Sequence, residues 1–346
     1  MGDLQQKSYG KLTILRIITL LFIAWSAGSI GVGMWQLFLI SDVTTTQTST
    51  SDSPDFARVP DVTTGVFQYG GSTAWAALRL RVDSVIQSER PELQLRYLQP
   101  QKEPPGSSPG IKMLLAGELD FVQTARSLSE EELKLADQKG LKLVQIPVAI
   151  DSIAIAVHPQ LDITGLTLQQ LQKMYTGEII NWQEIGGVDL KITAYSRPNS
   201  AGGTVDFFTT KILQNKNFGS NVEFVSTTTQ ALRRVAENPG AIYYGSTSAI
   251  IPQCIVKPLS VGIREDSLIT PYQEPLVTTE NCPPQRNQLN VKALRTAVYP
   301  LTYYLYVVFV QNEERRSQVG RAYADFLLTP QGQELIEEAG FIALER

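Results

Sequence analysis

The stretch LVQIPVAIDSIAIAV, residues 143–157, decides the fold. It is rich in β-branched residues and much longer than an ordinary strand of about five or six residues. Pro147 interrupts it, and Asp151 places a charge among apolar neighbours. A second long run, LTYYLYVVFV, occupies residues 301–310. Strands of this length can pass from one lobe to another, so we expect two lobes joined by two crossing strands.

The segments around these two runs predict an α/β protein. Short β-rich runs alternate with helical patterns, which indicates a largely parallel sheet. A length of 346 residues gives a prior of about two domains. We expect a folded module over residues 59–346, with one lobe at 59–150 and 305–346 and the other at 151–304. A ligand would lie in the cleft between the lobes.

Several elements can be placed by their end signals. Thr167 is a suitable N-cap for a helix over residues 167–174. A loop rich in Pro, Gly and Ser spans residues 100–110 and precedes a short helix expected from Ile111. The stretch from Ile251 to Asn290, rich in Pro, Gln and Asn, reads as a surface insertion.

Composition excludes several classes of function. The formal net charge is −4, which argues against broad electrostatic binding of nucleic acid. Two cysteines and one histidine rule out a cysteine-rich zinc site and a multi-histidine metal site, and we expect no cofactor. Charges within residues 1–58 cancel, so the negative charge belongs to the folded body. An anion would therefore be bound by a few nearby groups, such as helix N-termini and single arginines, and not by the overall charge of the protein.

The N-terminal region predicts a membrane anchor. Residues 17–40 carry no charge and are long enough to cross a bilayer, with Trp35 near one end. Lys7, Lys11 and Arg16 precede the run, so residues 1–16 are expected in the cytoplasm and the module outside. A cleaved signal peptide, with a weak site at residues 27–29, and a buried core helix are the alternatives. Residues 41–58, rich in Ser and Thr, read as a flexible linker.

Three segments place small and hydroxyl residues between a strand and a helix. They are YGGST at 69–73, GSSPG at 106–110 and SAGGT at 200–204. The first turn of a helix has free N–H groups that favour an anion, and hydroxyls add further donors. Ordinary helix capping is the alternative for each segment alone. The three together favour an anion site.

Four other side chains are candidates on chemical grounds. Arg197 precedes the third loop and could bind an oxyanion, or remain a solvated surface residue. Arg126 could point into a cleft or pair with an acid such as Glu130. Asp151 could accept a proton-bearing ligand or serve as a hydrogen-bond acceptor at a hinge. The position of His158, directly before Pro159, indicates a residue of a turn rather than a catalytic residue.

The two cysteines, Cys254 and Cys282, both lie in the expected insertion. Outside the cytoplasm an even pair favours a disulfide, which would close a long loop. Two separately buried, reduced cysteines are the alternative.

Six runs carry a resemblance to a known family. They are GSSPGI at 106–111, followed by LDF at 119–121; AIDSIA at 149–154; LTLQQL at 166–171; NWQEIGG at 181–187; and NPGAI at 238–242. In this order they resemble the substrate-binding proteins of phosphate ABC transporters, over about residues 62–346. The resemblance implies a type II periplasmic-binding-protein fold and capture of phosphate or a related oxyanion, in partnership with a transporter permease.

The resemblance also implies a ligand set, because the family holds phosphate with loop N–H groups, hydroxyls and one arginine. The matching positions are Ser72, Thr73, Ser107, Arg197, Gly202, Gly203 and Thr204. The residues considered above add Ser108, Arg126, Asp151 and Ser200.

Two departures from the family pattern bear on specificity. The arginine loop, RPNSAGGT at 197–204, is one residue longer than the family's and has Ala201 before the glycines. The position where some relatives have a ligand-accepting aspartate reads Thr124-Ala125-Arg126, so Asp151 is left as the expected acceptor. These departures also fit an alternative function, a membrane-anchored sensory or interaction protein with a degenerate cleft. A hydrolase using Ser107 or Ser200 with His158 is the least favoured reading, and we expect a binding protein rather than an enzyme.

Overall fold

The computed structural model describes residues 56–198, 203–311 and 315–344. The expected cytoplasmic segment, membrane span and most of the linker lie outside these residues. Within the described part, no helix is both long and apolar enough to cross a membrane.

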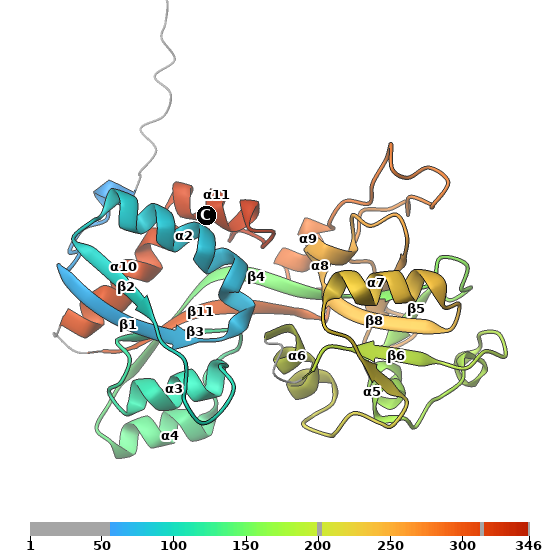
Figure 1. The fold of residues 1–346 in the computed structure, drawn as a ribbon, viewed down its shortest axis with the longest axis horizontal. Helices are drawn as coiled ribbons and strands as arrows, with labels where there is room; N and C mark the ends of the chain where they lie inside the picture. Colours follow the sequence, from blue (N-terminus) through green and yellow to red (C-terminus); the bar gives the residue numbers. More distant parts are fainter. Residues whose placement is uncertain (1–55, 199–202, 312–314, 345–346) are drawn as a thin grey trace, which may run out of the picture. The chain divides into compact units, whose positions relative to one another are not determined.

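The first lobe, shown on the left in Figure 1, is built on three parallel strands. Strand β1 (Gly65–Gly71) lies between β2 (Leu93–Tyr97) and β3 (Phe121–Thr124) and pairs with both. Helices α3 (Ser107–Leu115) and α4 (Glu130–Gln138) lie on one side of these strands in Figure 1. The other side carries α2 (Ala76–Glu89), α10 (Arg315–Leu328) and α11 (Pro330–Glu338), and short 3-10 turns occupy Phe56–Arg58 and Thr73–Trp75.

The second lobe repeats this arrangement with shorter elements. Strand β6 (Thr193–Ser196) lies between β7 (Val222–Phe224) and β8 (Ala241–Ser246), again in parallel. Strand β9 (Lys257–Gly262) pairs with β5 (Gly165–Thr167) and β10 (Leu268–Ile269). The helical elements are α5 (Leu168–Thr176), η3 (Trp182–Ile185), α6 (Gly203–Phe207), η5 (Phe208–Ile212), α7 (Thr228–Glu237), α8 (Thr247–Ile250) and α9 (Val291–Arg295).

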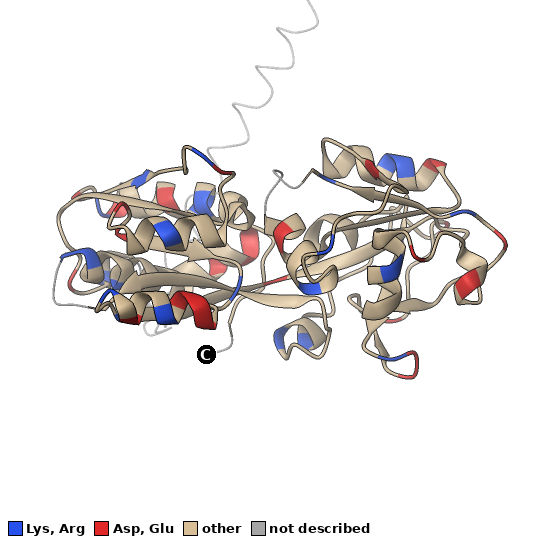
Figure 2. Cartoon of the chain, turned by 90° about the horizontal axis from the view of Figure 1, so that it is seen from below, with Lys and Arg blue, Asp and Glu red and all other residues tan. Residues whose placement is uncertain are grey.

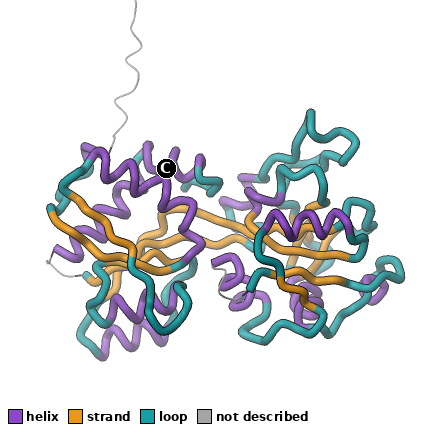
Figure 3. The backbone as a smooth tube through the Cα atoms, in the orientation of Figure 1, coloured by secondary structure: helices purple, strands orange, loops and turns teal. Residues whose placement is uncertain are grey.

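Two long strands, β4 (Leu143–Val157) and β11 (Thr302–Val310), join the lobes (Figures 1 and 3). They pair antiparallel with each other over residues 143–152 of β4, and β4 then continues to pair with β8 and β9. The prediction of two crossing strands is therefore confirmed. The lobe boundaries that we placed at 150/151 and 304/305 stay a prediction.

The sheet is mixed rather than largely parallel. Its strand order is β2-β1-β3-β11-β4-β8-β6-β7. The expected parallel pairing holds inside each lobe, but β11 returns along β4 in the opposite direction, so every pairing of these two hinge strands is antiparallel. Pro147, which we expected to break the run, instead coincides with a register shift. The partners of Leu305 and Tyr306 are Ala149 and Pro147, which leaves Val148 as an extra residue.

Side-chain caps fix several helix starts. Thr167 accepts from the Gln170 amide and so caps α5 as predicted. Helix α3 begins at Ser107, earlier than the expected Ile111, because Pro109 lies in the first turn, where its missing N–H costs nothing. As a result, the two serines of the second loop belong to the N-terminus of a helix.

The expected insertion is only partly a surface feature. Residues 257–262 form β9, which is largely buried and pairs with β4, whereas the rest is mostly loop. Cys254 and Cys282 form a disulfide with their Cα atoms 5.5 Å apart. The pair thus closes a loop of 28 residues in sequence separation.

Candidate functional site

A cavity of about 280 Å³ lies between the two lobes. The first lobe contributes Ser107, Ser108 and Arg126, at the start of α3 and just after β3. The second contributes Gly203 and Asp206 from α6, together with other side chains of both lobes. Four of the residues proposed from sequence are therefore brought together at one place.

The first loop reaches this region through Thr73. Its hydroxyl oxygen accepts a hydrogen bond of 2.8 Å from the Gly203 amide, which belongs to the other lobe. A β-carbon on Gly203 would lie 2.7 Å from the backbone nitrogen of Ala74, so only glycine allows this approach. The neighbouring Ser72 is completely buried and accepts from the Ala74 amide at 3.3 Å. The start of α6 thus abuts the first loop.

The second loop is tied to the end of β3. Ser107 is only 8% exposed, and its hydroxyl oxygen accepts from the Ala125 amide at 3.1 Å. Ser108 accepts from the Arg126 guanidinium at 2.6 Å. Ala125 therefore takes part through its backbone, although its side chain offers no hydrogen bond.

Four hydroxyls share one pattern of hydrogen bonding. A serine or threonine hydroxyl has one proton to donate and can accept two bonds. Each of the four accepts from a protein N–H group, and none donates to another group in the described residues: Ser72, Thr73, Ser107 and Ser108. Their protons remain available, which is the arrangement an oxyanion needs.

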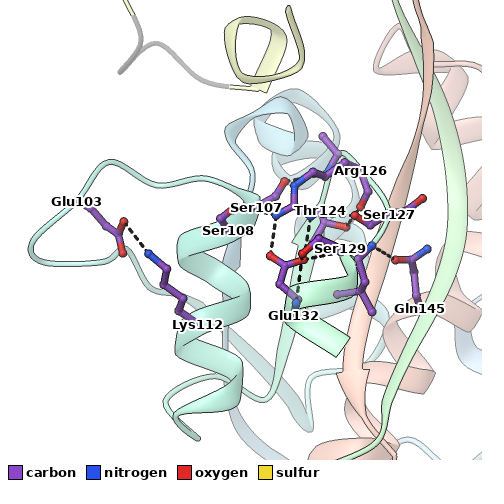
Figure 4. A network of polar contacts seen from close by, with 12 residues as sticks. Glu103, Ser107, Ser108, Lys112, Thr124, Arg126, Ser127, Ser129, Glu132 and Gln145 are labelled. Atoms are coloured by element: carbon purple, nitrogen blue, oxygen red, sulfur yellow. Dashed lines mark hydrogen bonds and ion pairs between the residues drawn. The ribbon is translucent and has the colours of Figure 1, made fainter. Parts of the chain in front are cut away.

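Arg126 is already paired with Glu132, and not with Glu130 as the sequence suggested (Figure 4). The guanidinium makes two bonds to this carboxylate, at 2.7 and 2.9 Å. Burial raises the pKa of the Glu132 carboxyl, but the bonds from Arg126 and Ser129 outweigh burial and hold it below its usual range. The charge of Arg126 is therefore balanced, and its visible role is to hold Ser108.

Arg197, unlike Arg126, has a guanidinium nitrogen without a hydrogen-bond partner among the described residues. It follows β6, and its Nε atom is buried with no hydrogen-bond partner among the described residues. Its positive charge acts to lower the pKa values of Tyr243 and Tyr244, although burial dominates and raises both. A buried N–H group without a partner is costly, so Arg197 is a group to which an anion would bring a missing acceptor.

Asp151 lies in the hinge and not among the residues that surround the cavity. Its side chain is buried, with one oxygen accepting from the Ser152 amide at 2.7 Å and the other from the Tyr303 hydroxyl. Burial raises its pKa to about 6, against the lowering effect of the bonds from Tyr303, Ser152 and Ser246. The arrangement agrees with the hinge-acceptor alternative, and direct contact between Asp151 and a ligand stays a prediction.

The third loop is described only in part. Ser200 and Gly202 lie outside the described residues. Gly203 opens α6, and Thr204 is the second residue of that helix. The expected participation of all four residues in ligand binding stays a prediction.

Asp206 is a functional candidate that the sequence reasoning missed. It lies in the first turn of α6, borders the cavity, and places a carboxylate oxygen 3.2 Å from where a β-carbon on Gly106 would stand. Burial raises its pKa, and the nearby charge of Arg126 partly opposes that effect. The available signal was an acid two residues after Thr204, at a helix start.

His158 shows no catalytic arrangement. Its Nδ1 atom accepts from the Gln160 amide at 3.2 Å, a local bond within a turn. It is not among the residues that surround the cavity with Ser107. Within the described part of the chain there is also no cluster of three or more His, Cys, Asp or Glu suited to a metal ion.

Charged side chains of both signs are interspersed over the helices of both lobes (Figure 2). Around the cavity, the described residues include both Arg126 and Lys211 and the acids Glu103 and Asp206. An anion would therefore be recognised by the local groups described above.

Two α/β lobes joined by two strands, with a polar cavity between them, define the class of bilobed ligand-binding proteins. The chain belongs to the PBP superfamily, because the model of the PBP superfamily domain matches residues 45–331.

Individual relatives extend this assignment. The chain is 28% identical to the phosphate-binding protein PstS of Staphylococcus haemolyticus over 242 residues, which cover 69% of this chain and 70% of that protein. It is 25% identical to the PstS of Staphylococcus aureus strain bovine RF122 over 241 residues, covering 69% and 67%. These relatives are named as binding proteins and not as enzymes.

Solved structures show the same fold. An ABC-type phosphate transport receptor from Vibrio cholerae superposes with a TM-score of 0.63 at 22% identity, covering 80% of this chain and 99% of that one. PstS from Borrelia burgdorferi gives a TM-score of 0.59 at 21% identity, covering 81% and 99%. The periplasmic-binding-protein-like fold expected from the sequence is confirmed.

Proposed function

We propose that this chain captures inorganic phosphate, or a closely related oxyanion, in the cavity between its lobes. It would act as the extracytoplasmic solute-binding protein of an ABC-type phosphate uptake system, without enzymatic activity. The observation that carries the proposal is the set of four hydroxyls that each accept from a protein N–H group and donate to no group in the described residues. The relatives named for phosphate binding support the choice of anion.

The ligand would be bound as the sequence resemblance implies. Thr73, Ser107 and Ser108 would donate hydroxyl protons, and the N-terminus of α6 at Gly203 would supply N–H groups in place of its present bond to Thr73. Arg197 would bind the anion through a guanidinium whose Nε lacks a partner. Ser72, Ser200, Gly202 and Thr204 complete the proposed set.

Asp206 would select for a proton-bearing anion. Its carboxylate borders the cavity beside the second loop and could accept a hydrogen bond from hydrogen phosphate. Sulfate carries no proton at neutral pH, so the same carboxylate would repel it. This assigns to Asp206 the acceptor role that the sequence left to Asp151.

Equilibrium dialysis with labelled phosphate, competed by sulfate, tests this function. We expect saturable binding with weak competition by sulfate. Asp206→Asn should weaken phosphate binding and make sulfate a better competitor, whereas Asp266→Asn, at an exposed ion pair with Arg264, should change neither. Absence of saturable phosphate binding would overturn the proposal and favour a sensory or interaction protein with a degenerate cleft.

The same proposal places the module outside the cytoplasmic membrane on a single N-terminal helix. The support is the uncharged run 17–40 behind Lys7, Lys11 and Arg16. In membrane fractions of cells expressing the full chain, we expect the protein to resist alkaline carbonate extraction and protease to reach it only from the outer side. Release by carbonate, with loss of the N-terminal residues, would instead support a cleaved signal peptide.

A further inference from the structure

The first loop, YGGST at 69–73, is held from behind by two neighbouring strands. The Ser72 amide donates to the backbone carbonyl of Gln123, on β3, at 2.7 Å. The Tyr97 hydroxyl, on β2, donates to the Gly71 carbonyl at 3.2 Å. A β-carbon on Gly71 would lie 2.1 Å from the Gln123 carbonyl oxygen, so only glycine allows this close contact. The position of the loop therefore depends on where Tyr97 and Gln123 stand.

Arg79 of α2 contacts both of these side chains. Its guanidinium carbon lies 3.7 Å from the centroid of the Tyr97 ring, a cation–π contact. One of its nitrogens donates to the side-chain carbonyl oxygen of Gln123 at 3.3 Å. The two routes from this guanidinium end at adjacent residues of the first loop, Gly71 and Ser72.

The Gln123 side chain is fixed at its other end as well. It is completely buried, and its Nε2 atom donates to the Tyr323 hydroxyl at 2.8 Å. That hydroxyl donates in turn to Asp83 of α2 at 2.8 Å. Turning the amide over would face donor with donor at Arg79 and acceptor with acceptor at Tyr323. The amide therefore has one orientation, and Arg79 supports one side of it.

The same groups reach the cavity between the lobes by two contacts. Thr73, the last residue of the first loop, accepts from the Gly203 amide at 2.8 Å. Ala125, two residues after Gln123, donates its amide proton to the Ser107 hydroxyl oxygen at 3.1 Å. Gly203, Ala125 and Ser107 all line the cavity. A shift of the first loop or of the end of β3 would therefore move groups that border the anion site.

We propose that Arg79 is a positioning residue for anion capture, which holds the first loop in its binding arrangement without touching the ligand. The inference rests on the proposed function. Arg79 is not among the residues that line the cavity, so its effect passes through Tyr97 and Gln123. A planar guanidinium lies flat on a ring and donates to an amide oxygen at the same time, which the single ammonium of lysine does not do. The loop is thus ordered before the anion arrives, which lowers the entropy cost of binding.

Arg79→Ala, Arg79→Lys and Tyr97→Phe test this inference. Dialysis against labelled phosphate gives the affinity of each variant, and hydrogen exchange of the proteins without phosphate reports whether the Ser72 amide keeps its bond. Arg81→Ala is the matched control. It removes the same charge from the same helix, at an exposed arginine whose carboxylate partner, Glu338, lies 3.1 Å away.

We expect Arg79→Ala and Arg79→Lys to bind phosphate about three- to tenfold more weakly than wild type, and Tyr97→Phe about two- to fivefold more weakly. Residues 70–74 should exchange faster in these three variants, while strand β8 of the second lobe exchanges as in wild type. Arg81→Ala should match wild type in both measurements. The loss in the lysine variant separates positioning from charge, because lysine keeps the positive charge.

An affinity of Arg79→Lys equal to that of wild type would overturn the inference, because the charge alone would then suffice. Faster exchange spread evenly over both lobes would also overturn it, since Arg79 would then stabilise the whole fold and not the loop. If Arg79→Ala does not fold, Tyr97→Phe decides, because it keeps the ring and loses only the bond to Gly71. Wild-type affinity in that variant would contradict the inference and leave phosphate binding intact. Absence of phosphate binding by wild type would overturn the proposed function, and this inference with it.

Discussion

At the scale of single residues, hydrogen-bond direction separates the groups of the cleft. Thr73, Ser107 and Ser108 accept from protein N–H groups and donate to no side chain or carbonyl in the part of the chain that the structure describes. Arg126 is neutralised by a two-bond pair with Glu132, while the buried Nε of Arg197 has no described partner. The two arginines therefore differ in what an anion would gain from them.

Arg197→Ala should weaken phosphate binding by at least about tenfold, because a hydrogen bond to a charged group contributes about 1.5–3 kcal/mol. Arg264→Ala, which removes an exposed arginine paired with Asp266, is the control and should bind as wild type. Dialysis of both variants against labelled phosphate makes the comparison. An Arg197→Ala affinity within about threefold of wild type would remove Arg197 from the proposed site.

Sequence reasoning could identify which loops hold the site but not how each side chain is used. Ser107 and Gly203 were found because small and hydroxyl residues before a helix form a local pattern. Asp206 was missed because its relevance depends on Gly106, which is distant in sequence and is brought near by the meeting of the lobes. The sequence offered an acid such as Glu130 as a partner of Arg126, and the structure shows that the partner is Glu132.

At the scale of elements, the sequence predicted a helix start correctly where a neighbouring residue determines that start. Thr167 caps α5 as its sequence position predicted. The sequence did not predict strand β9, which lies within the expected insertion, because its hydrogen-bond partner β4 is far away in sequence. Helix α3 begins four residues before its expected start, because Pro109 is compatible with the first turn of a helix although Pro and Ser are also typical of loops.

The disulfide is an element whose effect can be measured. It joins residues 28 apart, and the chain-entropy argument gives about 3.5 kcal/mol of stabilisation for a loop of that size. Replacing Cys254 and Cys282 together by serine should lower the free energy of unfolding by about 2–4 kcal/mol in urea titration. Because the loop lies away from the cavity residues, phosphate affinity should be unchanged. A stability equal to that of wild type would show that the bond constrains nothing.

At the scale of the whole folded module, two strands join the lobes between which the cavity lies. β4 and β11 pair with each other and carry Asp151 and Tyr303 at the hinge. The lobes meet where the Gly203 amide binds Thr73, a contact that an anion would replace. The long β-rich runs predicted this architecture, whereas the antiparallel pairing at the hinge follows from how the chain returns and is not visible in either run alone.

A crystal structure of the protein grown with phosphate, compared with crystals grown with sulfate, tests the central claim most directly. The account predicts one phosphate between the start of α3 and the start of α6. It should lie within hydrogen-bond distance of Ser107, Gly203 and the Arg197 guanidinium, with one of its oxygens facing Asp206. The sulfate crystals should lack an anion there. Phosphate bound elsewhere, or a cleft that stays closed on the contact between Thr73 and Gly203, would contradict it.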